Sequence, residues 1–146
     1  MTEARFYKAD TEPPRFWERW ERRKIYDAKR RWVLEFPNAW LLTTSWLIVR
    51  KADRVVVGEA GFKGPPGERK ALELGYSTRK KYQGQGIMTE TVGALCRFAF
   101  AQNEYKIRRI CAYTKPDNTA SQRVLEHNGF IRGSNEGRYW FWEKMA

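Results

Sequence analysis

Apolar residues recur at helical spacing in two long segments of the chain. Residues 88–102 show the clearer pattern, because the apolar positions fall three and four residues apart. The buried stripe expected there consists of Met88, Val92, Leu95, Cys96 and Ala99. Residues 15–35 keep a rougher spacing of the same kind, through Phe16, Trp20, Tyr26, Lys29 and Val33. Both segments are therefore predicted to be helices with one apolar side.

The helix over residues 15–35 admits two interpretations. Because its other positions are largely charged, its apolar side would pack on a sheet. The same basic and aromatic residues would also suit one wall of a binding site. Packing on a sheet is favoured, and both interpretations can hold together. We expect this helix to end at Pro37-Asn38, and the first dozen residues, up to Pro13-Pro14, to be an extended lead-in.

The segments 46–51 and 54–62 are rich in residues that favour strands. Ala52-Asp53 lies between them, which is typical of a β-hairpin. A Gly-Pro-Pro-Gly sequence at residues 64–67 then predicts a loop.

Two further strands are predicted over residues 70–78 and 107–114. Side chains alternate between the two faces of a strand. Leu72 and Leu74 therefore share one face of the first strand, and Glu73 lies on the other.

The last quarter of the chain predicts a short helix followed by strand. Residues 117–128 form the helix, with Asp117 or Asn118 as its N-cap and Gly129 placed to end it. The closing strand begins after Phe130 and is strongest at residues 139–142. The order is helix, β-meander, helix, strand, helix, strand, which is typical of a mixed α/β fold around one sheet.

Length and composition narrow the class of protein. The chain has 146 residues, which suits a single domain over 1–146. It lacks an apolar run long enough to span a bilayer and a signal-peptide pattern, which favours a cytoplasmic protein without a membrane partner. Cys96 and Cys111 have no His or further Cys nearby, so two buried reduced thiols are expected and no metal site.

The charge balance is strongly basic. With 28 Lys and Arg against 17 Asp and Glu, the net charge is +11. Such an excess attracts polyanions, and nucleic acid, a phosphorylated cofactor and an acidic protein surface all fit it.

Residues 81–89, Lys-Tyr-Gln-Gly-Gln-Gly-Ile-Met-Thr, follow a predicted strand and open a predicted helix. Glycines let the backbone come close to a ligand, and the N–H groups at a helix start favour phosphate. A Walker loop is excluded because Gly86 is not followed by Lys-Ser/Thr, and a dinucleotide fingerprint because position 89 is Thr. The local pattern fits either a pyrophosphate cradle or a simple tight turn.

The surrounding segments distinguish these two interpretations. The basic-x-x-Gly-x-Gly spacing at 81–86, after Leu-Gly-Tyr-Ser at 74–77, resembles motif A of the GNAT acetyltransferases. Residues 118–130, with Asn-x-x-Ser and Asn-Gly-Phe, resemble the second motif of their Rim-like branch, which acetylates α-amino groups of ribosomal proteins. Residues 57–62 resemble the strand before motif A. The resemblance covers about half of the chain and does not include its N-terminal third, where this family builds its acceptor site.

The resemblance implies a central mixed sheet flanked by helices, with acetyl-CoA between two splayed parallel strands, 70–78 and 107–114. Leu74, Tyr76 and Ser77 would offer backbone groups to the pantetheine amides, and Asn118 would reach it from the other side. Lys81 stands where the family usually has Arg or Gln, and would act as a point charge. The N–H groups on the pyrophosphate would come from Gln83, Gly84, Gln85, Gly86, Ile87 and Met88.

The implied reaction is direct attack of a primary amine on the thioester, which needs a base and a proton for the leaving thiolate. Glu73 is the expected base, with Glu59 as the alternative. Many relatives protonate the thiolate with a Tyr at the position of Leu125, so Ser121 is the expected donor here. Tyr113 and Tyr76 are the other candidates for that role, and His127 is given none.

Two other functions remain open at this point. A basic nucleic-acid-binding module fits the charge, although the chain has no nucleic-acid motif and the acetyltransferase reading does not require nucleic acid. A non-catalytic acyl-CoA-binding protein of the same fold fits the missing tyrosine. The expected acceptor is a peptide N-terminus or a small neutral or anionic amine, because the chain is poor in acid. The oligomeric state is open, a dimer included.

Overall fold

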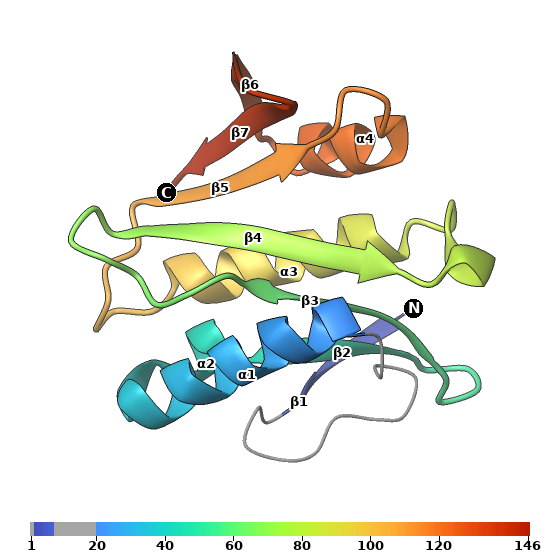
Figure 1. The fold of residues 1–146 in the computed structure, drawn as a ribbon. Coiled ribbons are helices and arrows are strands. Elements are labelled where there is room, and N and C mark those ends of the chain that lie inside the picture. The colour runs from blue at the N-terminus through green and yellow to red at the C-terminus, as the bar shows by residue number, and fades with distance from the viewer. Residues whose placement is uncertain (1, 8–19) are drawn as a thin grey trace.

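The computed structural model describes residues 2–7 and 20–146, with side chains from residue 27 on except at 136. One seven-stranded sheet has helices on both faces (Figure 1). Its elements are β1 (Thr2–Tyr7), α1 (Trp20–Glu35), the 3₁₀ turn η2 (Pro37–Ala39), α2 (Trp40–Thr43), β2 (Ser45–Arg50), β3 (Val56–Phe62), β4 (Ala71–Thr78), the 3₁₀ turn η3 (Lys80–Tyr82), α3 (Ile87–Phe100), β5 (Arg109–Thr114), α4 (Thr119–His127), β6 (Ile131–Glu136) and β7 (Tyr139–Met145).

The sheet has the strand order β1-β2-β3-β4-β5-β7-β6, and β4 and β5 are parallel neighbours. These two strands pair at three positions, from Ala71 opposite Arg109 to Glu73 opposite Cys111. Beyond Glu73 both strands continue without pairing to each other, and they diverge in Figure 1. The mixed sheet with a splayed parallel pair that the resemblance implies is confirmed.

The main core lies between the sheet and α3. The predicted stripe of α3 is buried along its whole length, and Leu72 and Leu74 of β4 are buried with it. Ile110 and Ala112 of β5 belong to the same core. Burial of such side chains contributes roughly 1.5–3 kcal/mol each, so this layer holds β4 and β5 in place around their divergence.

Helix α1 lies on the opposite face of the sheet from α3 (Figure 1). Its Lys29 is 5% exposed and donates hydrogen bonds to the carbonyl oxygens of Phe62, at 2.8 Å, and Thr44, at 3.3 Å. A Cβ at Gly61 would lie 2.7 Å from the Thr44 oxygen and 3.2 Å from Lys29 Nζ, so the glycine makes room for both. The helix is confirmed over Trp20–Glu35, and its packing on the sheet is confirmed at Lys29.

Several elements differ from the sequence prediction. The predicted helix residues 15–19, Phe16 among them, lie outside the described residues. The lead-in contains β1, which pairs antiparallel with β2, and the closing segment is a hairpin of β6 and β7 with Gly137 at φ +65° in its turn. The short helix α2 was not predicted. Cys96 is buried as expected, whereas Cys111 is half-buried.

The part of the chain that the structure describes contains no helix long and apolar enough to cross a membrane. Within the same residues, no group of three or more His, Cys, Asp or Glu side chains is placed to hold a metal ion.

Candidate functional site

A cavity of about 830 Å³ opens where β4 leaves β5. Its walls are the end of β4, the loop into α3, the first turn of α3 and one side of α4. The residues that line it are Tyr76, Ser77, Thr78, Tyr82, Gln83, Gly84, Gln85, Gly86, Ile87, Met88, Thr89, Glu90, Asn118, Ala120, Ser121, Arg123, Val124 and His127.

The loop before α3 presents bare backbone to this cavity. Gly84 and Gly86 have φ values of +73° and +75°, a left-handed region that favours glycine, and a Cβ at either would meet nothing within 4 Å. Gly86 is the N-cap of α3 and provides no side-chain cap. The N–H groups of a first helical turn have no partners within the helix, and with the positive end of the helix dipole they attract anions. The loop is therefore suited to a phosphate group.

The free edge of β4 follows from its register with β3. Lys63 N–H bonds to the Glu73 carbonyl and Arg79 N–H to the Val57 carbonyl, so odd-numbered residues of β4 direct their backbone groups toward β3. Even-numbered residues direct theirs toward β5: the pairing of Glu73 with Cys111 uses the Leu74 N–H, whereas the Leu74 carbonyl and the backbone of Tyr76 face the opening. The backbone of Ser77 faces Glu59 of β3, and the next N–H on the side of the opening belongs to Thr78. The expected contacts of Leu74, Tyr76 and Ser77 with pantetheine stay a prediction.

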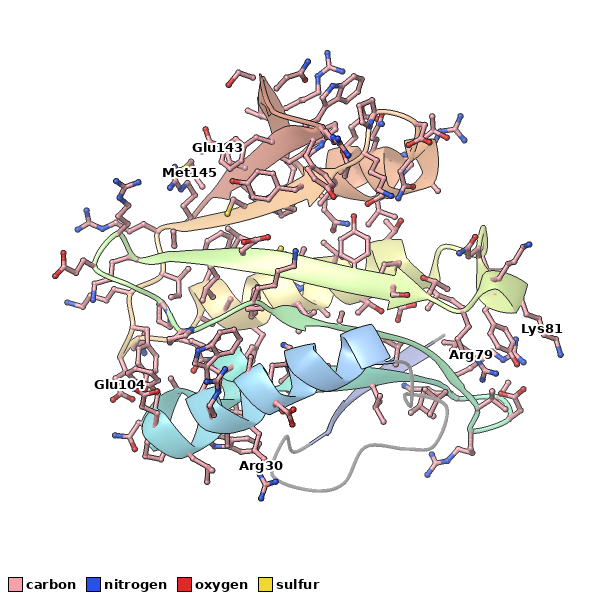
Figure 2. All side chains as sticks on the ribbon, viewed as in Figure 1. Arg30, Arg79, Lys81, Glu104, Glu143 and Met145 are labelled. Carbon is pink, nitrogen blue, oxygen red and sulfur yellow. The ribbon has the colours of Figure 1, made fainter. Side chains whose placement is uncertain are left out.

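The structure does not bring Lys81 to the cavity. Its side chain points outward from η3 (Figure 2), with Nζ 5.7 Å from the centre of the Tyr82 ring. Among the described residues, the acidic and basic side chains on the cavity wall are those of Glu90, Arg123 and His127. The sequence analysis missed Arg123 and gave His127 no role. Arg123 follows Ala120 by three residues and His127 follows Arg123 by four, so all three lie on one side of α4, and this spacing could have found them.

Two hydroxyl groups meet on the wall formed by β4 and α4. Tyr76 Oη lies 2.7 Å from Ser121 Oγ and 3.2 Å from the Ser121 carbonyl oxygen. Burial raises the pKa of Tyr76 to about 12, and the hydrogen bond with Ser121 acts in the opposite direction. Leu125 is fully buried in the core and does not line the cavity. The structure thus brings together two of the three residues considered as proton donors.

Helix α4 is held in place at both ends. Asn118 Oδ1 accepts a hydrogen bond from the Ser121 N–H, so Asn118 is the N-cap, as predicted. At the other end Asn128 Nδ2 donates to the carbonyls of Val124, at 2.8 Å, and Thr89 of α3, at 3.1 Å. These bonds join the two helices that form the cavity walls.

Glu73 lies on the other face of the sheet from the buried Leu72 and Leu74, as predicted, and does not line the cavity. Its Oε1 accepts a hydrogen bond from Lys63 Nζ at 2.9 Å, and its Cα pairs with Cys111 at the last contact before the strands diverge. Glu59, opposite Ser77 on β3, is on the same face by strand alternation.

Tyr113, the third candidate donor, is separate from the cavity. It is 38% exposed, and its ring lies 5.5 Å from that of Phe141 on β7. The structure does not place it beside Ser121.

Comparisons with known proteins agree with this geometry. A family model for the acetyltransferase (GNAT) domain matches residues 3–131. YjdG of Bacillus subtilis, an uncharacterized N-acetyltransferase, is 35% identical over 98 residues, which cover 67% of this chain and 57% of that protein. The ribosomal protein uS5-alanine N-acetyltransferase of Escherichia coli is 35% identical over 79 residues, which cover 53% of this chain and 40% of that protein. The chain thus spans about half the length of these curated relatives.

The fold is shared with solved structures at lower sequence identity. A ribosomal L7/L12 α-N-protein acetyltransferase, solved in complex with coenzyme A, matches with a TM-score of 0.73 and 18% identity. The match covers 99% of this chain and 93% of the other.

Proposed function

The chain belongs to the GNAT acetyltransferase family, and we propose that it moves an acetyl group from acetyl-CoA to a primary amine. The observation that carries the proposal is the cavity beside the end of β4 where this strand leaves β5, with a bare backbone loop and one side of α4 in its wall. The proposal assigns this activity to a single domain over residues 1–146.

The residues present fit the cofactor. Backbone N–H groups of residues 83–88 would hold the pyrophosphate, in space that a side chain at Gly84 or Gly86 would fill. The Leu74 carbonyl, the backbone groups of Tyr76 and the Thr78 N–H would pair with the pantetheine amides as a missing strand would, with Asn118 on the other side. Acetyl-CoA supplies the activated thioester. Arg123 lines the cavity and Lys81 does not, so Arg123 is the cation that we propose attracts its phosphates.

Glu73 is the proposed general base. It stands at the last paired position before β4 and β5 separate, and would take the proton of the amine directly or through water. Lys63 holds its carboxylate in place through the 2.9 Å contact. Glu59 is the alternative, on the same face of the neighbouring strand. Ser121 on the cavity wall is the proposed donor to the leaving sulfur.

The proposed acceptor is a protein α-amino group or a small neutral or anionic amine. Support comes from Glu73 and Glu59, the two carboxylates on the sheet face opposite to the buried Leu72 and Leu74. Glu73 is paired with Lys63, and Glu59 lies close enough to Lys29 to favour its charged form. A polycationic amine would have to compete with these two lysines. The relative that acetylates a ribosomal protein alanine supports the protein N-terminus.

The test is a release assay for free CoA with a panel of acceptors: peptides beginning with alanine or serine, small neutral and anionic amines, and polyamines. We expect release that depends on the amine, with the acetyl amide found by mass spectrometry, and less with polyamines than with peptides. Acetyl-CoA binding measured by calorimetry on the same sample separates a wrong acceptor from a wrong cofactor. Absence of binding at millimolar acetyl-CoA would overturn the proposal.

A further inference from the structure

Tyr76 and Ser121 come from elements far apart in the sequence, yet their hydroxyl oxygens are 2.7 Å apart on the cavity wall. Tyr76 belongs to β4 and Ser121 to the first turn of α4. Leu125, where the family resemblance implies a tyrosine, is fully buried and cannot reach the cavity. A phenol hydroxyl nevertheless lies beside Ser121, because Tyr76 reaches it from β4.

On the basis of the function proposed above, we propose that Tyr76 and Ser121 act as one proton-donating pair. Ser121 touches the leaving sulfur, and Tyr76 acts through Ser121 as a positioning residue that also supplies the proton. The pair thereby performs the role for which this chain has no tyrosine at position 125.

The proton balance of the step is as follows. When the C–S bond of the tetrahedral adduct breaks, its electron pair goes to sulfur, and sulfur takes the Ser121 hydroxyl proton. Ser121 Oγ takes the Tyr76 proton over their short contact. The phenolate regains a proton from water in the open cavity, while the base passes the proton of the amine to solvent. The net result is an amide, a thiol and an unchanged pair.

The two hydroxyls achieve together what neither achieves alone. An aliphatic hydroxyl is a far weaker acid than a phenol, so Ser121 by itself would form an unfavourable alkoxide. Tyr76 is half-buried behind it, and burial raises the pKa of Tyr76 to about 12, which keeps the phenol protonated at neutral pH. The hydrogen bond with Ser121 lowers the pKa of Tyr76, against the effect of burial, and so eases transfer of the Tyr76 proton to Ser121 Oγ.

The contact also fixes geometry. Tyr76 Oη lies 3.2 Å from the Ser121 carbonyl as well, so the phenol is held against one residue by two contacts. Asn118 caps the Ser121 N–H at 3.1 Å. The hydroxyl of Ser121 is therefore oriented from both sides of the helix start.

The experiment compares Tyr76→Phe, Ser121→Ala and the double variant, with Tyr105→Phe as the matched control. The control makes the same chemical change at a tyrosine that lies outside the cavity wall. Each variant is measured for kcat and KM in the CoA-release assay, for acetyl-CoA affinity by calorimetry, and for its midpoint of unfolding in urea.

We expect Tyr76→Phe and Ser121→Ala each to lower kcat by roughly 10²-fold, within the usual range for a general acid, with acetyl-CoA affinity unchanged. The double variant should be no slower than the slower single variant, because residues that act as a unit are not additive. The urea midpoint of the double variant should likewise be no lower than that of the less stable single variant, since each single change breaks the hydrogen bond between Tyr76 and Ser121. Tyr105→Phe should keep the unsubstituted kcat.

A kcat for Tyr76→Phe equal to that of the control would overturn the inference, even if Ser121→Ala is slow, because Ser121 would then act alone. Additive losses in the double variant would overturn it as well. Absence of acetyl-CoA binding or turnover in the unsubstituted protein is a different result, since it refutes the proposed function on which the pair depends.

Discussion

Replacing Gly86 by valine tests the phosphate cradle against the alternative that this loop is only a tight turn. Gly86 has φ +75°, and a Cβ there would meet nothing within 4 Å. The Cβ of a substituted residue therefore meets no atom of the protein itself. Two effects of the substitution can then be separated. The strained backbone lowers the stability of the fold in every case, whereas the affinity for acetyl-CoA falls only if phosphate approaches this backbone.

The backbone cost follows from the left-handed conformation. A residue with a Cβ in that region costs roughly 1–2 kcal/mol, and a β-branched residue somewhat more. The loss of affinity follows from blocked N–H groups. A hydrogen bond to a charged group contributes about 1.5–3 kcal/mol, so losing two of them costs about 3–6 kcal/mol. We therefore expect the dissociation constant for acetyl-CoA to rise at least about 100-fold.

Gly137→Val is the matched control. Gly137 has φ +65° and also has nothing within 4 Å of its Cβ position, but it lies in the β6–β7 turn, outside the cavity wall. Calorimetry should show normal acetyl-CoA affinity in the control, and thermal unfolding a similar destabilisation in both variants. S-acetylpantetheine, which lacks the pyrophosphate, should bind the Gly86 variant as it binds the unsubstituted protein. Unchanged acetyl-CoA affinity in a folded Gly86→Val protein would refute the cradle.

Three further outcomes follow from the structure. Glu73→Gln should lower turnover roughly 10²- to 10⁴-fold with acetyl-CoA affinity retained. The lost turnover should return in part at high pH, where the amine is uncharged, and an unaltered pH–rate profile would make Glu59 the next residue to test. Saturation with acetyl-CoA at 100 times its dissociation constant should raise the free energy of unfolding by about 2.7 kcal/mol, and an unshifted melting temperature would contradict this. Burial lowers the pKa of Lys29 from 10.5 to about 8, so the unfolded chain binds this proton more tightly. Stability should therefore rise between pH 8 and 10.5, by up to about 3 kcal/mol in urea unfolding, and Lys29→Met should lack that rise.

The elements with a strong local pattern could be predicted from the sequence. The α3 stripe has regular spacing, and the alternation of Leu72, Glu73 and Leu74 needs only the geometry of one strand, so both are confirmed. β1 could not be found in this way, because an edge strand is defined by its partner β2 rather than by its own residues.

Some features of the candidate site could be predicted from the sequence and others could not, for reasons that differ from residue to residue. The loop at Gly84 and Gly86 is recognisable because glycine is tied to its backbone conformation. At Ser77 and Lys81 the structure adds a direction: strand register turns the Ser77 backbone toward β3, and the η3 turn carries the Lys81 side chain outward. Sequence spacing contains neither fact. The contact of Tyr76 with Ser121, 45 positions apart, exists only in the folded protein.

Residue-resolved amide hydrogen exchange, with and without acetyl-CoA, tests the central claim most directly. In the free protein the N–H groups of Gly75 and Ser77 should be protected by β3, and that of Leu74 by its pairing with β5, whereas those of Tyr76 and Thr78 face the opening between β4 and β5. Saturating acetyl-CoA should slow exchange at Tyr76, Thr78 and residues 83–88 and leave Gly75 and Ser77 nearly unchanged. Equal exchange at these positions with and without bound acetyl-CoA would contradict the placement of the cofactor between the two strands.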